Sequence, residues 1–186
     1  MTDLSAACSK VKMLISDVDG VLTDGSVYKG SDGTELKRFN VSDGAGAAIA
    51  RTAGLKIALI SGRQSDATAL RAAEMKIAEV HNGTLDKRIP YKQIKEKYNL
   101  KDDEIAYLGD DIIDIVIMKQ AGVPIAVANA NEMVKGVSIH VTDKSGGDGA
   151  FREAIEWILF QQGRLEKILI ALQNELYSLS ETDPNH

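Results

Sequence analysis

Short apolar runs alternate along this chain with longer stretches in which apolar residues recur every three or four positions. The short runs predict strands buried on both faces, and the longer amphipathic stretches predict helices. Strands are expected at 11–15, 55–60, 78–81, 105–108, 124–128 and 139–142, and helices at 44–53, 65–75, 87–98, 111–121 and 149–179. Strands that alternate with helices of this length indicate βαβ units. We therefore expect an α/β protein with a Rossmann-like three-layer α/β/α fold and a parallel central sheet.

Capping residues suggest where several of these helices begin and end. Ser42 or Asp43 can N-cap the first predicted helix, and Gly54 can end it. Asn99 is expected to end a later helix, and Gly163 is expected to break the long C-terminal one.

The segment 26–39 departs from this alternation. Apolar and polar residues alternate on two arms around the turn sequence Gly30-Ser31-Asp32-Gly33, which predicts a β-hairpin. Because it directly follows the first strand, the hairpin should project over the carboxyl edge of the sheet as a flap. A plain surface loop is the alternative.

Length, charge and cysteine content narrow the class of protein. A chain of 186 residues with 44% hydrophobic residues can bury one sizeable core. Its net charge of −5 argues against a nucleic-acid partner, which would need clustered positive charge. The sequence contains no apolar run of membrane-spanning length and no signal-peptide core. Its single cysteine, Cys8, fits a reducing compartment. We expect a cytoplasmic protein without a membrane partner.

Two aspartates directly follow the first strand. Asp17 and Asp19 are separated by one residue, so their side chains point the same way in an extended chain. Residues at this position lie at the carboxyl edge of the sheet, where open α/β sheets build their ligand sites. Two converging carboxylates repel each other, which favours a metal ion between them. The alternative is an ordinary turn at Asp19-Gly20.

Later segments bring further polar groups to the same edge. Ser61 follows the second strand, Lys87 begins a helix, and an acidic group (Asp110, Asp111 and Asp114) follows the strand over 105–108. Taken singly, each of these residues has another explanation. Ser61 could lie in an ordinary turn, Lys87 could belong to a solvated charge run, and the aspartates could complement the N-terminus of a helix. Taken together, the aspartates offer the oxygen ligands that Mg²⁺ prefers.

The run Asp17-Val18-Asp19-Gly20-Val21-Leu22-Thr23-Asp24-Gly25 resembles motif I, D-x-D-x-[TV], of the haloacid dehalogenase superfamily. Within it, the run is similar to the small cap-less branch of 3-deoxy-D-manno-octulosonate 8-phosphate (KDO 8-phosphate) phosphatases. The resemblance spans about residues 12–165. Further motifs follow in the family's order: Phe39-Asn40-Val41-Ser42-Asp43-Gly44, Ile60-Ser61-Gly62-Arg63, Asn82-Gly83 with Lys87, Gly109-Asp110-Asp111 with Asp114, and Gly146-Gly147-Asp148-Gly149-Ala150.

This resemblance implies hydrolysis of a phosphomonoester through an aspartyl-phosphate. Asp17 would be the nucleophile. Asp19 would be the general acid and base, a role that calls for a pKa raised by burial or by a neighbouring carboxylate. Ser61 would donate to the phosphate, and Lys87 would offset negative charge. Arg88 is the rival of Lys87, but the motif spacing favours Lys87.

The resemblance also implies a Mg²⁺ site. Asp17, the backbone carbonyl of Asp19, and Asp110 would supply its protein ligands. Asp111 and Asp114 would orient metal-bound water and the motif lysine.

On the substrate side, Arg63 matches the arginine of the KDO 8-phosphate branch, whereas the branch for nine-carbon sugar acids tends to carry glutamate there. An arginine suits a bidentate pair with a sugar carboxylate. The implied partner is therefore a small phosphorylated eight-carbon sugar acid of lipopolysaccharide precursor synthesis. Gly62, Arg71, Asn40 and Gly44 are further candidates for substrate binding, although a solvated helix face is an equal explanation for Arg71.

Three other functions stay open at this point. The chain could act on nine-carbon sialic-type sugar acid phosphates, or be a non-catalytic phospho-receiver, or be a regulatory module of a kind fused elsewhere to a nucleotidyltransferase. A phosphatase needs an acid/base two residues after its nucleophile, and Asp19 supplies one.

The organisation implied by the resemblance is a phosphatase domain over 1–165, with its flap at about 26–39, and a homotetramer packed through that flap. The remaining segment, 166–186, reads as a helical tail whose amphipathic pattern needs a partner surface.

Overall fold

A six-stranded parallel sheet forms the centre of the computed structural model, which describes residues 4–182. The strands follow the spatial order β5-β4-β1-β6-β7-β8, and all five neighbouring pairs run parallel. Their bounds are β1 Met13–Ser16, β4 Lys56–Ser61, β5 Glu79–Asn82, β6 Ile105–Gly109, β7 Val123–Ala126 and β8 His140–Val141. The predicted α/β fold with a parallel central sheet is confirmed.

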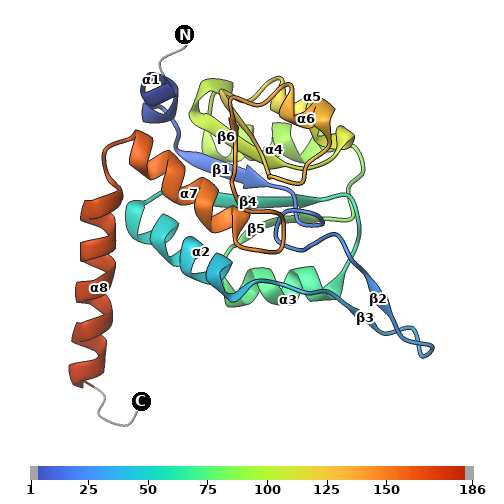
Figure 1. Ribbon diagram of the computed structural model, residues 1–186, viewed down its shortest axis with the longest axis horizontal. Coiled ribbons are helices and arrows are strands. Elements are labelled where there is room, and N and C mark those ends of the chain that lie inside the picture. Colours follow the sequence, from blue (N-terminus) through green and yellow to red (C-terminus); the bar gives the residue numbers. More distant parts are fainter. Residues whose placement is uncertain (1–3, 183–186) are drawn as a thin grey trace.

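Helices cover both faces of this sheet (Figure 1). On one face α2 packs against α7, with α1 and α8 beside them, and on the other α4 packs against α5. Their bounds are α1 Leu4–Ser9, α2 Val41–Ala53, α3 Asp66–Glu74, α4 Arg88–Tyr98, α5 Ile115–Met118, α6 Glu132–Lys135, α7 Ala150–Gln161 and α8 Leu165–Thr182. None of the helices in the described range is long and apolar enough to cross a membrane.

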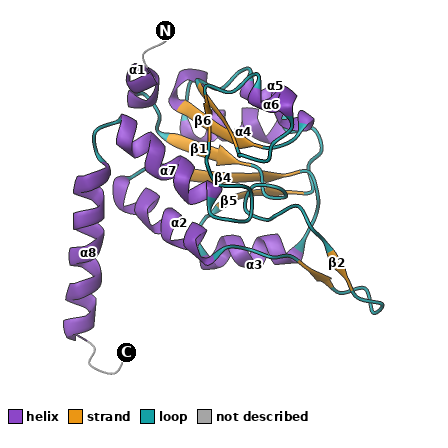
Figure 2. Cartoon of the chain, in the orientation of Figure 1, coloured by secondary structure: helices purple, strands orange, loops and turns teal. Residues whose placement is uncertain are grey.

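The central strand explains where the site lies. All four residues of β1 are buried, as a strand covered on both faces requires. The chain runs from β1 outward through β4 and β5 and then returns to the other side of β1 as β6. This reversal between β1 and β6 is a topological switch point, which is where open α/β sheets bind ligands at the carboxyl ends of their strands. Figure 2 shows the strands leading into loops on the side from which the flap projects.

The predicted hairpin is present. Strands β2 (Tyr28–Lys29) and β3 (Glu35–Leu36) pair antiparallel and project from the body of the molecule (Figure 1). The backbone N–H of Gly30 donates to the carbonyl of Thr34 at 2.9 Å, which closes the turn. A bridge between Thr23 and Phe39 joins the base of the flap to the loop after β1.

Several helix ends differ from expectation. The N-cap of α2 is Asn40 rather than Ser42 or Asp43, because the Oδ1 of Asn40 accepts from the backbone N–H of Ser42 at 2.9 Å. Gly54 and Asn99 end their helices in the left-handed conformation, as expected.

The helix predicted over 111–121 is shorter than expected. It is replaced by a 3₁₀ turn, Ile112–Asp114, followed by α5. The cause is the side chain of Asp114, which turns back to accept backbone N–H groups at the start of this segment. The short helices α1 and α6 were not expected, since neither is long enough to show a helical period.

The C-terminal helical pattern breaks at Gly163, as predicted, with α7 before it and α8 after it. The first turns of α8 pack against the core through Leu165, Ile168, Leu169 and Leu172. The helix then continues beyond the body (Figure 1). Residues 1–3 of the predicted domain and 183–186 of the predicted tail lie outside the described range, and the division at 165 stays a prediction.

Candidate active site

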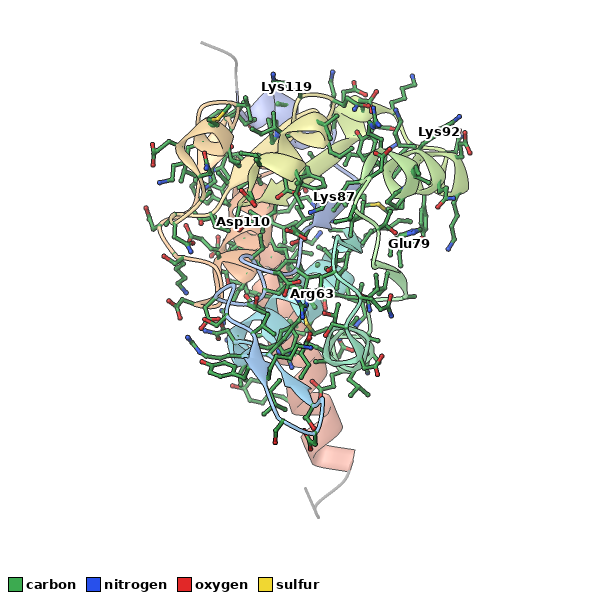
Figure 3. The ribbon with its side chains drawn as sticks, turned by 90° about the vertical axis from the view of Figure 1, so that its right-hand side faces the viewer. Arg63, Glu79, Lys87, Lys92, Asp110 and Lys119 are labelled. Carbon is green, nitrogen blue, oxygen red and sulfur yellow. The ribbon has the colours of Figure 1, made fainter. Side chains whose placement is uncertain are left out.

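The carboxyl ends of three neighbouring strands bring the predicted polar residues together. Asp17 follows β1, Ser61 ends β4 and Asp110 follows β6. A cavity of about 490 Å³ opens here, and it is lined by Asp17, Asp19, Gly25, Val27, Gly62, Arg63, Leu85, Asp110, Asp111 and Ile113. Figure 3 looks onto this edge, with Lys87, Asp110 and Arg63 near its centre and Lys92 and Lys119 at the periphery.

Lys87 is a buried cation at the centre of the site. Its side chain is fully buried, and its Nζ lies 2.9 Å from Oδ1 of Asp17 and 2.6 Å from Oδ1 of Asp114. The rival residue Arg88 instead pairs with Asp86 at the surface. The geometry therefore favours Lys87, as the motif spacing predicted.

Asp114 holds this lysine and is itself fully bonded. Its Oδ1 also accepts from the hydroxyl of the buried Tyr107 at 2.6 Å. Its Oδ2 accepts from the backbone N–H groups of Asp110 at 3.1 Å and Asp111 at 3.3 Å. Asp114 therefore orients Lys87, one of its two expected roles. The side chain of Asp111 instead caps the following turn by accepting from the backbone N–H of Ile112 at 2.8 Å.

The electrostatics leave this cluster short of positive charge. Burial raises the pKa of Asp17, and the charge of Asp114 raises it further, while Lys87 opposes both effects. Burial, with the charges of Asp17 and Asp114, also raises the pKa of Asp110. Burial alone would lower the pKa of Lys87, but the two carboxylates beside it outweigh burial and raise the pKa. Three carboxylates thus share a single buried ammonium group, an arrangement that a divalent cation would stabilise.

The oxygen atoms fit a metal ion. One oxygen each of Asp17, Asp110 and Asp114 lies within 4.8 Å of the other two. The oxygens of Asp114 are already bonded, whereas Oδ1 of Asp110 is buried with no hydrogen-bond partner among the described residues. An orphaned buried carboxylate oxygen is costly unless a ligand satisfies it. Asp17 and Asp110 are therefore the side chains best placed to hold a metal.

Two glycines allow the close packing around these aspartates. Gly20 has φ +90°, and a Cβ built there would lie 2.0 Å from Oδ2 of Asp110. A Cβ at Gly146 would lie 1.7 Å from the carbonyl oxygen of Gly20. The glycine-rich loop near the C-terminus thus packs directly on the loop that carries Asp17 and Asp19.

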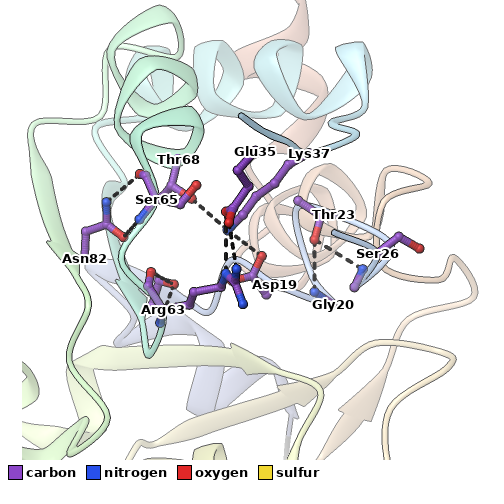
Figure 4. A network of polar contacts seen from close by, with 12 residues as sticks. Asp19, Gly20, Thr23, Ser26, Glu35, Lys37, Arg63, Ser65, Thr68 and Asn82 are labelled. Carbon is purple, nitrogen blue, oxygen red and sulfur yellow. Dashed lines mark hydrogen bonds and ion pairs between the residues drawn. The ribbon is translucent and has the colours of Figure 1, made fainter. Parts of the chain in front are cut away.

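Asp19 has a neighbour that the sequence did not reveal. Its Oδ1 lies 2.6 Å from the Nζ of Lys37, a fully buried side chain that arrives from the end of the flap. Lys37 also donates to the hydroxyl of Thr68 on α3 at 3.3 Å (Figure 4). The charged side chain that contacts Asp19 is therefore a lysine, whereas the proposed acid role called for burial or a neighbouring carboxylate. Spacing within the chain gave no signal for Lys37, because the contact depends on how the flap folds back.

Ser61 is buried at the end of β4. Its hydroxyl donates to the carbonyl of Arg63 at 2.9 Å and accepts from the backbone N–H of Arg63 at 3.2 Å. Its carbonyl accepts from the N–H groups of Gly83 at 3.0 Å and Thr84 at 2.9 Å. These bonds fix the turn that carries Gly62 and Arg63 into the cavity.

Asn40, Gly44 and Arg71 are not among the residues that line the cavity. Arg71 donates to the backbone carbonyl of Asn40 at 2.9 Å and to Glu74 at 2.9 Å. A Cβ at Gly44 would lie 3.3 Å from Nη2 of Arg71. In the structure these three residues join the start of α2 to α3, and a direct substrate contact stays a prediction.

Comparison with known proteins places this geometry in a family. A model of the haloacid dehalogenase-like hydrolases matches residues 64–153. Over 165 residues the chain is 38% identical to the 3-deoxy-D-manno-octulosonate 8-phosphate phosphatase KdsC of Escherichia coli (strain K12). The aligned residues cover 89% of this chain and 88% of the relative.

Solved structures agree with the sequence comparison. A hydrolase of the HAD superfamily (subfamily III A) from Legionella pneumophila superimposes with a TM-score of 0.89 at 37% identity, covering 94% of this chain and 96% of that one. The 3-deoxy-D-manno-octulosonate 8-phosphate phosphatase of Moraxella catarrhalis, solved with magnesium, phosphate and KDO, gives a TM-score of 0.88 at 34% identity, covering 92% of this chain and 98% of that one. The chain therefore belongs to the haloacid dehalogenase-like hydrolases, in the family of 3-deoxy-D-manno-octulosonate 8-phosphate phosphatases.

Proposed function

We propose that this protein is a Mg²⁺-dependent phosphatase that removes phosphate from KDO 8-phosphate, a step of lipopolysaccharide precursor synthesis. The observation that carries the proposal is the placement of Asp17. Its buried carboxylate is held by Lys87 and shares one cavity with Asp19 and Asp110. Relatives named for this activity match over most of the chain, and one was solved with magnesium, phosphate and KDO.

In the first step Asp17 acts as the nucleophile. A carboxylate oxygen of Asp17 attacks phosphorus, the bond from phosphorus to the sugar oxygen breaks, and an aspartyl-phosphate forms. Asp19 gives its proton to the departing sugar oxygen. Lys87, 2.9 Å from Asp17, offsets the negative charge that gathers at the phosphoryl group.

In the second step water releases the phosphate. Asp19, now a carboxylate, takes a proton from a water molecule, whose oxygen attacks phosphorus. The bond between phosphorus and Asp17 breaks, and inorganic phosphate leaves. Lys37 contacts Oδ1 of Asp19, so Oδ2 is the oxygen that gives and takes the proton in this proposal.

The Mg²⁺ ligands in this proposal are Asp17, the backbone carbonyl of Asp19, and Asp110. When bound, Mg²⁺ supplies positive charge that neutralises the phosphoryl oxygens during transfer. Asp114 positions Lys87, and Asp111 lies where it can bond a metal-bound water.

Recognition of the substrate is assigned to the loop after β4. Gly62 and Arg63 line the cavity, where the backbone N–H of Gly62 can donate to phosphate and Arg63 can bind the sugar carboxylate. Ser61 would donate to phosphate once its hydroxyl turns away from the carbonyl of Arg63, to which it donates at 2.9 Å in this structure. Asn40, Gly44 and Arg71 remain further candidates for substrate binding.

Phosphate release from a panel of substrates tests the proposal. The panel contains KDO 8-phosphate, a nine-carbon sialic-type sugar acid phosphate and p-nitrophenyl phosphate, each with Mg²⁺ and with EDTA. We expect the highest kcat/KM for KDO 8-phosphate and no turnover in EDTA. Preference for the nine-carbon acid would favour the alternative phosphatase, and absence of turnover on every substrate would favour a phospho-receiver.

We further infer a cytoplasmic homotetramer assembled through the flap, with a phosphatase domain over 1–165 and a helical tail from 166. Apolar side chains on and beside the flap support this assembly, since Tyr28, Leu36 and Val41 are exposed. Light scattering coupled to size-exclusion chromatography would measure the mass. A monomeric mass at micromolar concentration would contradict the assembly without affecting the proposed chemistry.

A further inference from the structure

An ion pair between Glu35 and Arg63 joins the flap to the wall of the active-site cavity. Arg63 donates from Nη2 to Oε2 of Glu35 at 2.6 Å and from Nε to Oε1 at 3.5 Å (Figure 4). This contact uses the Nε–Nη2 edge of the guanidinium group. The planar guanidinium carries five N–H donors, so its Nη1 side remains available to a second acceptor.

Glu35 approaches Arg63 from outside the active-site cavity. Arg63 lines the active-site cavity, whereas Glu35 lines a separate one of about 460 Å³ between the flap and the start of α3. The two residues therefore meet on the wall between the cavities. A carboxylate in this position contacts the arginine on the side away from the active-site cavity. It therefore leaves free the space in which a substrate would bind.

The flap strand is held in place by the buried side chain of Lys37. Two residues after Glu35, Lys37 forms its buried ion pair with Asp19, consistent with residues i and i+2 sharing one side of an extended chain. Across the hairpin, the Nζ of Lys29 lies 2.9 Å from Oε2 of Glu35. Glu35 is therefore presented to Arg63 by a strand that is already anchored in the site.

The ion pair is electrostatically favourable in this arrangement. Hydrogen bonds from Arg63, and next from Lys29, lower the pKa of Glu35 to about 2. Glu35 is consequently ionised across the physiological pH range. An arginine without such an ion pair samples many rotamers and loses side-chain conformational entropy when it binds a ligand.

We propose that Glu35 is a positioning residue through which the flap controls recognition of the substrate's carboxylate. Glu35 holds the guanidinium group of Arg63 with its free N–H groups toward the cavity, ready for a carboxylate. The flap thereby selects substrates that carry a carboxylate as well as a phosphate. This inference rests on the proposed phosphatase function and deepens it.

Steady-state kinetics of Glu35→Gln on two substrates provides the test. KDO 8-phosphate carries a carboxylate, and p-nitrophenyl phosphate does not. We expect KM for KDO 8-phosphate to rise about threefold to tenfold with little change in kcat, because a positioned charge pair of this kind contributes modestly. The kinetics on p-nitrophenyl phosphate should stay at the wild-type level, which also shows that the variant is folded.

Two further variants separate positioning from a structural role. Lys29→Gln removes the other cation on Glu35 and leaves Arg63 in place, so both substrates should behave as with wild type. In an Arg63→Ala background, adding Glu35→Gln should have no additional effect, because residues that act through one another are not additive.

Three results would overturn the inference. The first is a fall or no change in KM for the sugar acid in Glu35→Gln, and the second is an equal rise in KM for both substrates. The third is an undiminished effect of Glu35→Gln on KM in the Arg63→Ala background. A wild-type protein that hydrolyses p-nitrophenyl phosphate but not KDO 8-phosphate would reject the assigned substrate. Failure on both substrates would reject the proposed function itself, and in either case the inference would fall with it.

Discussion

The Nζ of Lys87 lies 2.9 Å from Oδ1 of Asp17, and neither side chain is appreciably exposed to solvent. The pair joins the start of α4 to the end of β1, residues that are far apart along the chain. Because the same ammonium group also bonds Asp114, one buried cation balances two of the three carboxylates at the centre of the site.

Replacing Lys87 should cost both stability and activity. Lys87→Met leaves Asp17 and Asp114 as buried unpaired carboxylates, so we expect a loss of about 3–5 kcal/mol in the free energy of unfolding. Phosphate release should disappear as well. Urea denaturation measures the first effect, and the exposed neighbour variant Arg88→Met should keep both the denaturation midpoint and the activity near wild type. An unchanged midpoint in Lys87→Met would contradict the buried pairing.

Asp110 should be needed for stabilisation by Mg²⁺. Saturating metal at 100 times its dissociation constant stabilises a folded protein by about 2.7 kcal/mol. We expect Mg²⁺ to raise the melting temperature of the wild type and of the distant surface variant Asp103→Asn, but not that of Asp110→Asn. Without metal, Asp110→Asn should melt above the wild type, because it removes one of three repelling carboxylates. The same Mg²⁺-dependent shift in all three proteins would place the metal elsewhere.

Gly20 and Gly33 offer a matched pair of substitutions. Both have φ +90°, but a Cβ at Gly20 would lie 2.0 Å from Oδ2 of Asp110, whereas nothing lies within 4 Å of one at Gly33. Both alanine variants carry the backbone strain, worth about 1–3 kcal/mol. Only Gly20→Ala should also displace Asp110, so it alone should weaken Mg²⁺ binding in a calorimetric titration. Equal Mg²⁺ affinities in the two variants would refute this role of Gly20.

Asp43 should make stability depend on pH. Burial raises the pKa of this carboxyl from 3.8 to about 6 in the folded protein. Its protonated form therefore contributes stability below pH 3.8, and that contribution is lost as the pH rises through about 6. Asp43→Asn removes the titration but keeps an oxygen that can accept from the backbone N–H of Arg152. In the wild type that backbone nitrogen lies 3.1 Å from Oδ1 of Asp43.

The stability of Asp43→Asn relative to wild type should therefore improve by about 2 kcal/mol between pH 4 and pH 7. Urea denaturation of both proteins at the two pH values measures the change, since other titrating groups cancel in the difference. A difference that is the same at both pH values would show that Asp43 does not titrate as described.

The strands and the principal acidic residues could be predicted from the sequence. Buried parallel strands read as apolar runs, and the residues after them necessarily meet at one edge of the sheet. Asp17, Asp110 and Lys87 therefore came together as expected, with the order of the family motifs as the guide.

Other features depend on contacts that no local pattern encodes. The approach of Lys37 to Asp19, and of Glu35 to Arg63, is decided by the angle at which the flap folds back over the site. The turn made by Asp114 shortened a helix whose apolar period looked regular. Asn40 is the N-cap of α2 in place of Ser42 or Asp43, and its side chain also donates to the carbonyl of Gly147 at 3.3 Å.

The most direct test is to locate the phosphoryl group on the enzyme. Wild-type protein mixed with KDO 8-phosphate and Mg²⁺ is quenched within milliseconds, reduced with borohydride, which converts an aspartyl-phosphate to homoserine, and mapped by peptide mass spectrometry. We expect homoserine at position 17, and none in Asp17→Asn, which should also release no phosphate. Labelling at a different residue, or wild-type turnover by Asp17→Asn, would contradict the account.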